Sequence, residues 1–155
     1  MISRAFELFA DYHQFYVWDA GIATWAPEDY TDEDIRRRVK VGPHVVVVQP
    51  VRQTTVPVSL SVHERDPGYD VGAWDHVVEC GLALPTGRLQ VHECTGGAVL
   101  DVSVSPSSYA VRVLFEGLDS LSEDRSSGND RYVLDLWPAT SSPTLRVVKQ
   151  WQPAG

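Results

Sequence analysis

Strand-like segments recur about every ten residues along this chain, separated by turn-forming residues. Val45 to Val48 is a continuous apolar run, whereas Thr54 to Val62 alternates apolar and polar residues. Both patterns are typical of strands in a sheet. Short strands in regular succession favour an all-β fold, an antiparallel β-sandwich of about nine or ten strands, with a β-barrel as the alternative. The later strands are expected at Val99 to Val104, Tyr109 to Phe115, Tyr132 to Trp137 and Leu145 to Trp151.

One segment, Glu28 to Val39, has the signals of a helix instead. Asp34 follows Thr31 at the spacing of a capping box, and acidic residues precede basic ones as the helix dipole prefers. We expect one short helix of about two turns. Because so short a helix is marginal alone, Ile35 and Val39 are expected to dock it against the sheet.

Two further segments carry specific expectations. Phe6 to Trp18 is crowded with aromatic and β-branched residues in approximate alternation, which predicts a strand with contacts on both faces. Pro57 interrupts the run from Thr54 to Val62. Since proline cannot donate a ladder hydrogen bond, we expect this strand at a sheet edge or a β-bulge at Pro57.

The segment from Trp74 to Cys94 has the pattern of a β-hairpin. Its two apolar runs flank the turn sequence Leu-Pro-Thr-Gly at 84–87, in which proline suits the second position and glycine the fourth. A two-residue loop gives the two runs a shared apolar face, with Cys80 pointing inward. The same register pairs Glu79 with His92 on the opposite face.

The 155 residues show no composition break, which indicates a single domain over residues 1–155. The N-terminus lacks the apolar core of a secretory signal, and no apolar run approaches the roughly 18 residues of a membrane span. We therefore expect a soluble cytoplasmic protein. Two cysteines fit that compartment as free thiols, with Cys80 facing inward and Cys94 outward.

The formal net charge is −8, from 21 acidic and 13 basic residues. Nucleic-acid binding depends on clustered Lys and Arg, so neither nucleic acid nor a membrane is expected as a partner. Negative charge suits a basic protein partner, although it also keeps a domain in solution without one. The acids gather in two segments, Glu28 to Asp34 and Glu116 to Asp124. On one side of a sandwich, the two segments would together attract a basic partner.

No motif in the chain predicts catalysis. A Gly-x-Ser-x-Gly elbow and a phosphate-binding loop are both absent from the sequence. Potential metal ligands occur at residues 63–66, 75–76 and 92–94. Adjacent strand residues point to opposite faces, however, and Glu79 with His92 supplies only two ligands of a tetrahedral site. We expect no catalytic residue, no metal and no cofactor, although carboxylate pairs assembled by the fold stay open.

Tryptophan is the residue type that most favours a binding surface. The five tryptophans fall at predicted strand ends or in loops, where an amphipathic ring can line a contact surface. Core packing explains each ring taken singly. They are Trp18, Trp25, Trp74, Trp137 and Trp151.

Three segments occur in order within residues 1–60: Tyr12-His13-Gln14-Phe15-Tyr16-Val17, Tyr30-Thr31-Asp32-Glu33-Asp34-Ile35, and the apolar strand at Val45 to Val48. This combination resembles the competence protein ComJ family of small bacterial proteins. Beyond residue 60 only the order of strands is similar, and the chain departs at Trp74–Cys94 and at 119–130. Members of that family are regarded as inhibitors that bind a DNA-entry nuclease. The resemblance implies a similar fold and an acidic, non-catalytic binding role.

We therefore hypothesise a binding protein of the nuclease-inhibitor or toxin-immunity type that blocks a basic partner, such as a nuclease or a toxin. Its acidic side chains would stand in for nucleic-acid phosphate, and aromatic rings would supply apolar anchors. The predicted partner-binding residues are Trp25, Asp29, Tyr30, Asp32, Glu33, Asp34, Glu123 and Asp124.

The rival hypothesis is a small-molecule or carbohydrate-binding sandwich, or an enzyme built on one. Such a protein would use a tryptophan-rich open end together with His13, His76 or Glu79. A deep pocket lined by tryptophan and histidine would favour this rival.

Overall fold

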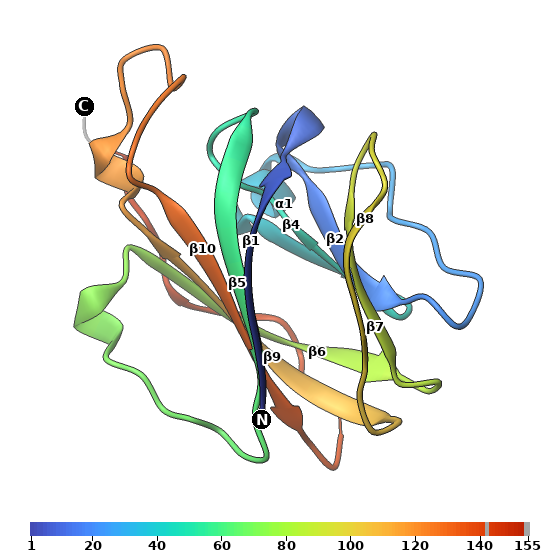
Figure 1. The fold of residues 1–155 in the computed structure, drawn as a ribbon. Helices are drawn as coiled ribbons and strands as arrows, with labels where there is room; N and C mark the ends of the chain where they lie inside the picture. The colour runs from blue at the N-terminus through green and yellow to red at the C-terminus, as the bar shows by residue number, and fades with distance from the viewer. Residues whose placement is uncertain (142, 154–155) are drawn as a thin grey trace.

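Two β-sheets packed face to face make up the protein, as Figure 1 shows. The computed structural model describes residues 1–141 and 143–153. These residues contain eleven strands, one α-helix and three short 3-10 helices. The predicted all-β sandwich is confirmed.

The first sheet has six strands, and most of its pairings join strands that are far apart in the sequence. Its one parallel pair joins β5 to β10, and every other pair is antiparallel. In spatial order the strands are β1 (Ile2–Phe9), β5 (Thr55–Val62), β10 (Arg131–Pro138), β9 (Ser107–Glu116), β6 (His76–Leu84) and β11 (Arg146–Lys149).

The second sheet has five strands, all of them antiparallel to their neighbours. Helix α1 (Asp32–Arg37) directly precedes its edge strand β3. In spatial order the strands are β3 (Val39–Gly42), β4 (Val45–Val48), β2 (Phe15–Asp19), β7 (Arg88–Glu93) and β8 (Ala98–Ser103).

The core lies between the sheets and consists mainly of aliphatic side chains. Alternation along the strands sends every second residue inward, so Phe15 and Val17 of β2 are fully buried. Opposite them, Val111, Val113 and Phe115 of β9 are buried as well. Both sheets therefore contribute to one core.

Strand β5 corrects the expectation for Pro57. The strand lies between β1 and β10, so it is not at a sheet edge. Its pairing with β10 begins at Val58, one residue after the proline, while Pro57 itself lies opposite Glu7 of β1. The missing amide donor thus falls just outside the ladder with β10, where an interior strand tolerates it.

The predicted hairpin between Trp74 and Cys94 is wrong. Strand β6 pairs with β9 and β11 in one sheet, and β7 pairs with β2 and β8 in the other. The turn at 84–87 carries the chain across the sandwich instead. It is held there by Asp19 at the end of β2, which accepts hydrogen bonds from the Thr86 amide (2.8 Å) and hydroxyl.

The apolar residues of β6 and β7 nevertheless belong to the same core cluster, to which the two strands contribute from different sheets. Cys80 is buried, as predicted. The predicted pairing of Glu79 with His92 does not form. Glu79 binds Arg112 (2.8 Å) and Arg146 (2.6 Å), and the His92 ring lies against Trp18 with centroids 5.1 Å apart.

The predicted strand from Phe6 to Trp18 is interrupted. A 3-10 helix, η1 (Asp11–His13), separates β1 from β2, and Tyr12 and His13 both have φ of 55°. Asp11 supports this turn by accepting hydrogen bonds from the Tyr12 amide (3.1 Å) and the Thr95 hydroxyl (2.8 Å). The chain thereby passes from the six-stranded sheet to the five-stranded one.

Helix α1 begins as predicted, with Thr31 and Asp34 forming a capping box. It ends earlier than expected, because Arg38 adopts a left-handed conformation with φ of 62°. Val39 is buried, but as the first residue of β3, and Ile35 is 48% exposed. Only one of the two predicted docking residues therefore packs.

The long connection between β5 and β6 lies against the outer face of the six-stranded sheet. Arg112 holds it there: the guanidinium pairs with Asp66 (3.0 Å) and stacks between Tyr69 and Trp137, at 4.2 and 4.7 Å from the ring centroids. In the described part of the chain no helix is long and apolar enough to cross a membrane.

Candidate functional site: an aromatic groove with acidic margins

The connection from β2 to α1 runs over the outer face of the five-stranded sheet (Figure 1). At the beginning of this connection, the Asp19 carboxylate accepts a hydrogen bond from the Gly21 amide (2.8 Å). Lys40 fixes its far end by donating to the Asp29 carbonyl (2.7 Å) and lying 5.1 Å from the Tyr30 ring centroid. Between these anchors Trp25 projects outward and is 77% exposed.

Beneath this connection lies a groove of about 450 Å³ that we call the aromatic groove. Aromatic rings from η1, β2 and the connection line it, and the rings of Tyr16 and Trp18 stack at a centroid distance of 5.3 Å. It thus offers a partner large apolar surfaces with polar edges. The five rings are those of Tyr12, Tyr16, Trp18, Trp25 and Tyr30.

The phenols of the groove differ in their hydrogen bonding. The Tyr16 hydroxyl donates to Gln14 (3.0 Å) and lies 3.1 Å from the Cys94 sulfur. The Tyr30 hydroxyl is buried and has no hydrogen-bond partner among the described residues. Burial raises the pKa of Tyr16 above its ordinary value and raises the pKa of Tyr30 to about 12. Both rings therefore present neutral hydroxyls near neutral pH.

Glu28 is the acidic residue that lines the groove. The acidic residues of α1 follow Tyr30 in the sequence and are not equivalent to one another. Asp32 is exposed and makes no ion pair within the described residues. Glu33 pairs with Arg36 (2.5 Å) and Arg37 (3.3 Å). The hydrogen bond from Lys40 and that from the Thr31 amide lower the pKa of Asp34 to about 2. Asp34 therefore serves the fold, whereas Asp32 is free to contact a partner.

The second acidic segment approaches from the connection between β9 and β10. Asp124 accepts hydrogen bonds from Ser122 and Ser126, and those from Ser126 contribute most to lowering its pKa to about 2. Glu123 is exposed. The next residue, Arg125, lines a second pocket together with Tyr30. The residue that follows the second acidic segment therefore lies beside Tyr30 of the first.

That second pocket, which we call the Arg38 pocket, adjoins the aromatic groove. It has a volume of about 320 Å³ and shares Tyr12, Gln14 and Tyr30 with the groove. Tyr12 is 65% exposed and lies at the junction of the two depressions. The two hollows are therefore neighbours on the surface of the protein.

Sequence reasoning identified the margins of this surface but missed much of its floor. Trp18 was among the tryptophans expected to favour a binding surface, and it lines the groove. Tyr12, Tyr16, Arg38 and Gln49 were not predicted as site residues, because their convergence depends on the turn at η1 and on the left-handed conformation at Arg38. Consecutive bulky residues after Asp11 were the one local signal, since an aspartate before a turn can bond the following amides.

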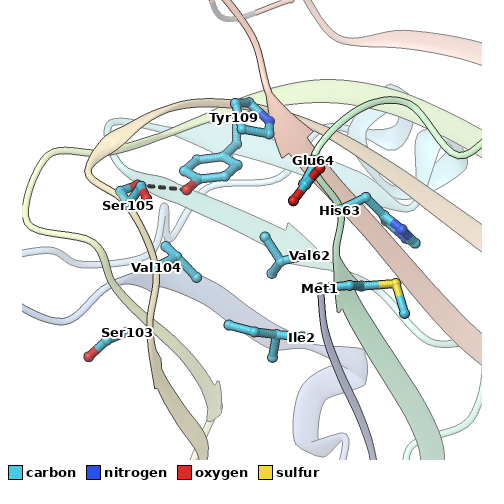
Figure 2. A pocket seen from close by; sticks show the side chains of 10 residues that line it. Met1, Ile2, Val62, His63, Glu64, Ser103, Val104, Ser105 and Tyr109 are labelled. Atoms are coloured by element: carbon cyan, nitrogen blue, oxygen red, sulfur yellow. Dashed lines mark hydrogen bonds between the residues drawn. The ribbon is translucent and has the colours of Figure 1, made fainter.

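A third pocket, of about 510 Å³, lies where the sandwich opens between β1 and β8 (Figure 2). Ile2, Val62 and Val104 form its apolar wall, and the Tyr109 hydroxyl donates to the Ser105 carbonyl (2.6 Å). No tryptophan lines it among the described residues. His63 on its rim is paired with Asp135 at 2.8 Å.

The residues that the rival hypothesis combined lie apart. His13 lines the Arg38 pocket, and Glu79 belongs to the Arg112 cluster. His76 is fully buried, with Nε2 2.8 Å from the Arg37 carbonyl and Nδ1 accepting from the Trp151 amide at 3.0 Å. The described residues contain no group of three or more potential ligands that could hold a metal ion.

Comparison with known proteins places the fold but assigns no family. No protein-family model matches the chain, and no curated protein matches it. Among solved structures, ComJ from Bacillus subtilis, an inhibitor of the DNA-degrading activity of NucA, is similar with a TM-score of 0.71 and 17% identity. That similarity covers 88% of this chain and 96% of ComJ.

A second similar structure is the product of crocagin biosynthetic gene J. Its TM-score is 0.60 at 18% identity, with 89% of this chain and 99% of that chain covered. The chain therefore has a ComJ-like fold. The predicted resemblance in the first 60 residues extends, at the level of structure, over most of the molecule.

Proposed function

We propose that this protein is a non-catalytic inhibitor that binds a basic nuclease through the aromatic groove and its acidic margins. The observation that carries the proposal is Trp25, which is 77% exposed at the rim of a groove lined by four further aromatic rings. Aromatic anchors of this kind supply much of the binding energy of protein interfaces.

The ComJ-like fold supports the same proposal. The similarity covers 96% of ComJ, so nearly the whole length of that inhibitor has a structural counterpart in this chain. The identity of 17% shows the fold alone, so the inhibitory role is our inference. We infer in addition that the protein acts in the bacterial cytoplasm, by blocking its partner rather than by altering it chemically.

The predicted partner-binding residues divide into two groups under this proposal. Trp25 and Tyr30 supply apolar contacts, and the exposed Asp29, Asp32 and Glu123 contact basic side chains of the nuclease. Because such acids would occupy positions that phosphates occupy on the enzyme, they would exclude DNA sterically and electrostatically. The remaining three predicted residues act through the local negative field, since their carboxylates are bonded within the chain: Glu33, Asp34 and Asp124.

The proposal is tested by affinity capture with a functional readout. The tagged protein is incubated with an extract of its source cells at low salt, washed, and eluted at high salt. We expect the eluate to contain a basic protein that degrades DNA after separation from the inhibitor and is inhibited again when the purified inhibitor is added back.

Two variants assign the capture to the proposed surface. Trp25→Ala should weaken binding by about 30-fold, the loss typical of a central aromatic anchor. Asp32→Lys should slow association about tenfold at low salt and less at high salt. The matched control is Glu64→Lys, an exposed charge reversal outside the groove. Equal binding by Asp32→Lys and Glu64→Lys, together with an unchanged Trp25→Ala, would overturn the proposal.

A further inference from the structure

The Arg38 pocket has a chemical character opposite to that of the rest of the molecule. The chain carries a net charge of −8, yet no aspartate or glutamate lines this pocket, and two arginines do. Arg38 ends helix α1, and Arg125 lies in the connection between β9 and β10. Ile35 and Val51 contribute apolar side chains to its lining.

Neither arginine of the pocket has a carboxylate partner among the described residues. Elsewhere in the fold partly buried cations are paired: Arg52 lies 2.7 Å from Asp130, and Lys40 lies 2.8 Å from Asp34. The Arg38 guanidinium instead donates one long hydrogen bond of 3.4 Å to the Gln49 carbonyl and lies 5.4 Å from the Trp151 ring centroid. Its positive charge is therefore available to an anion.

Two buried polar atoms at the pocket are unsatisfied as well. Gln49 is 6% exposed, and its Oε1 has no hydrogen-bond partner among the described residues. The Tyr30 hydroxyl is in the same situation. These are the two buried side-chain atoms without partners in the described chain, and both belong to residues that line this one pocket. Because buried polar groups in folded proteins are almost always paired, both are suited to a ligand.

Backbone strain is concentrated at the same place. Five described residues other than glycine have positive φ, and four of them line the Arg38 pocket. Left-handed conformations of bulky residues are unfavourable and gather at binding sites, where the surroundings hold side chains in position. The four residues are Tyr12 (55°), His13 (55°), Arg38 (62°) and Arg125 (58°).

We propose that the Arg38 pocket binds a small organic oxyanion, a carboxylate or a phosphate monoester with an apolar or aromatic body. Arg38 and Arg125 hold the oxyanion by charge-assisted hydrogen bonds, as guanidinium groups do for both kinds of anion. Ile35 and Val51 contact the body of the ligand. The Tyr30 hydroxyl and the Gln49 amide bond to polar groups of the ligand that enter the floor.

This site is independent of the proposed inhibition of a nuclease, since it needs no protein partner. It is tested by titrating the isotopically labelled protein with phenylacetate, phenyl phosphate and neutral phenylacetamide while recording amide NMR spectra. We expect the two anions to bind with dissociation constants of about 1 mM or below, a range typical of ligands with so few atoms. Shifts should centre on residues 12–14, 38, 49 and 125, and the neutral amide should bind at least about tenfold more weakly.

Variants then connect binding to the two arginines. Arg38→Gln and Arg125→Gln should each weaken anion binding about tenfold, because each removes a charge-assisted contact. Arg4→Gln, an exposed arginine on β1, is the matched control and should bind as the wild type does. Arg125 lies in an exposed loop, so its variant keeps the test valid even if Arg38→Gln, at a helix end, fails to fold.

A preference for phenylacetate or for phenyl phosphate supports the site and identifies the oxyanion. Equal binding of phenylacetamide, shifts centred elsewhere, or full binding by Arg125→Gln would overturn it. Inorganic phosphate is included as a third probe, and its binding in place of the organic anions would also overturn the proposal, because the apolar wall would then have no role.

Discussion

On the outer face of the six-stranded sheet, Arg112 is enclosed by two carboxylates and two aromatic rings. On the outer face of the five-stranded sheet, Trp25 is 77% exposed and the Tyr30 hydroxyl has no partner among the described residues. Both surfaces combine aromatic rings with charged groups. The first satisfies its polar groups internally and so stabilises the fold, whereas the second leaves them available to another molecule.

The largest effect on stability is expected at Arg112, on the outer face of the six-stranded sheet. Arg112→Ala removes a buried cation from Asp66 and Glu79 and releases the β5–β6 connection, so it should lower the free energy of unfolding by about 2 to 4 kcal/mol. Chemical denaturation measures this. The control is Arg131→Ala, which breaks an exposed pair with Glu116 and should cost about 1 kcal/mol or less. Similar losses in both variants would contradict the distinction.

Two tyrosines compare a bonded hydroxyl with an unbonded one. The Tyr132 hydroxyl donates to Asp130 (2.5 Å) and accepts from the Val51 amide (3.0 Å), so Tyr132→Phe should destabilise the protein by about 2 kcal/mol. Tyr30→Phe removes a buried hydroxyl without partners and should be neutral or slightly stabilising. Thermal unfolding of both variants measures the contrast, which would disappear if Tyr30 were bonded within the fold.

The buried His76 ring connects the end of α1 to the C-terminal segment. It lies within hydrogen-bond distance of the Arg37 carbonyl and accepts a hydrogen bond from the Trp151 amide. Burial lowers the pKa of His76 below its ordinary value of 6.5. The unfolded chain therefore binds a proton at a pH where the folded protein does not. The resulting stability is present above pH 6.5 and is lost as the pH falls below it, by up to about 1.4 kcal/mol per pH unit.

Denaturation of the wild type and of His76→Gln from pH 7.5 to pH 5 isolates this contribution, because the other histidines are common to both. The wild type should lose more stability than the variant over this range. Parallel profiles would show that His76 titrates in the folded protein as it does in the unfolded chain.

The smallest effect on stability is expected at Trp25. Trp25→Ala should change the free energy of unfolding by less than about 0.5 kcal/mol, because an exposed ring loses little packing. This variant should nevertheless weaken partner binding about 30-fold, as proposed above. A large loss of stability would mean that Trp25 packs in the fold. The aromatic groove would then stabilise the fold, as the Arg112 cluster does, instead of being available to a partner.

Local patterning was sufficient wherever a residue's role depends on its near neighbours in sequence. The capping box of Thr31 and Asp34 was predicted from spacing, and Cys80 was predicted to point inward and is buried. The turn at 84–87 was placed correctly too. The strand pairing around it was not, because apolar runs that enter one core from two different sheets have the same sequence pattern as runs paired in one hairpin.

The sequence by itself determined that this chain forms a β-sandwich with one capped helix, since period-two patterning and turn residues act over a few positions. Only the tertiary structure decided which strands pair, that Glu79 belongs with Arg112 rather than His92, and that Arg38 and Arg125 line one pocket. The physical reason is that pairing and charge compensation depend on contacts between residues as far apart as β5 and β10, whose geometry no local pattern records.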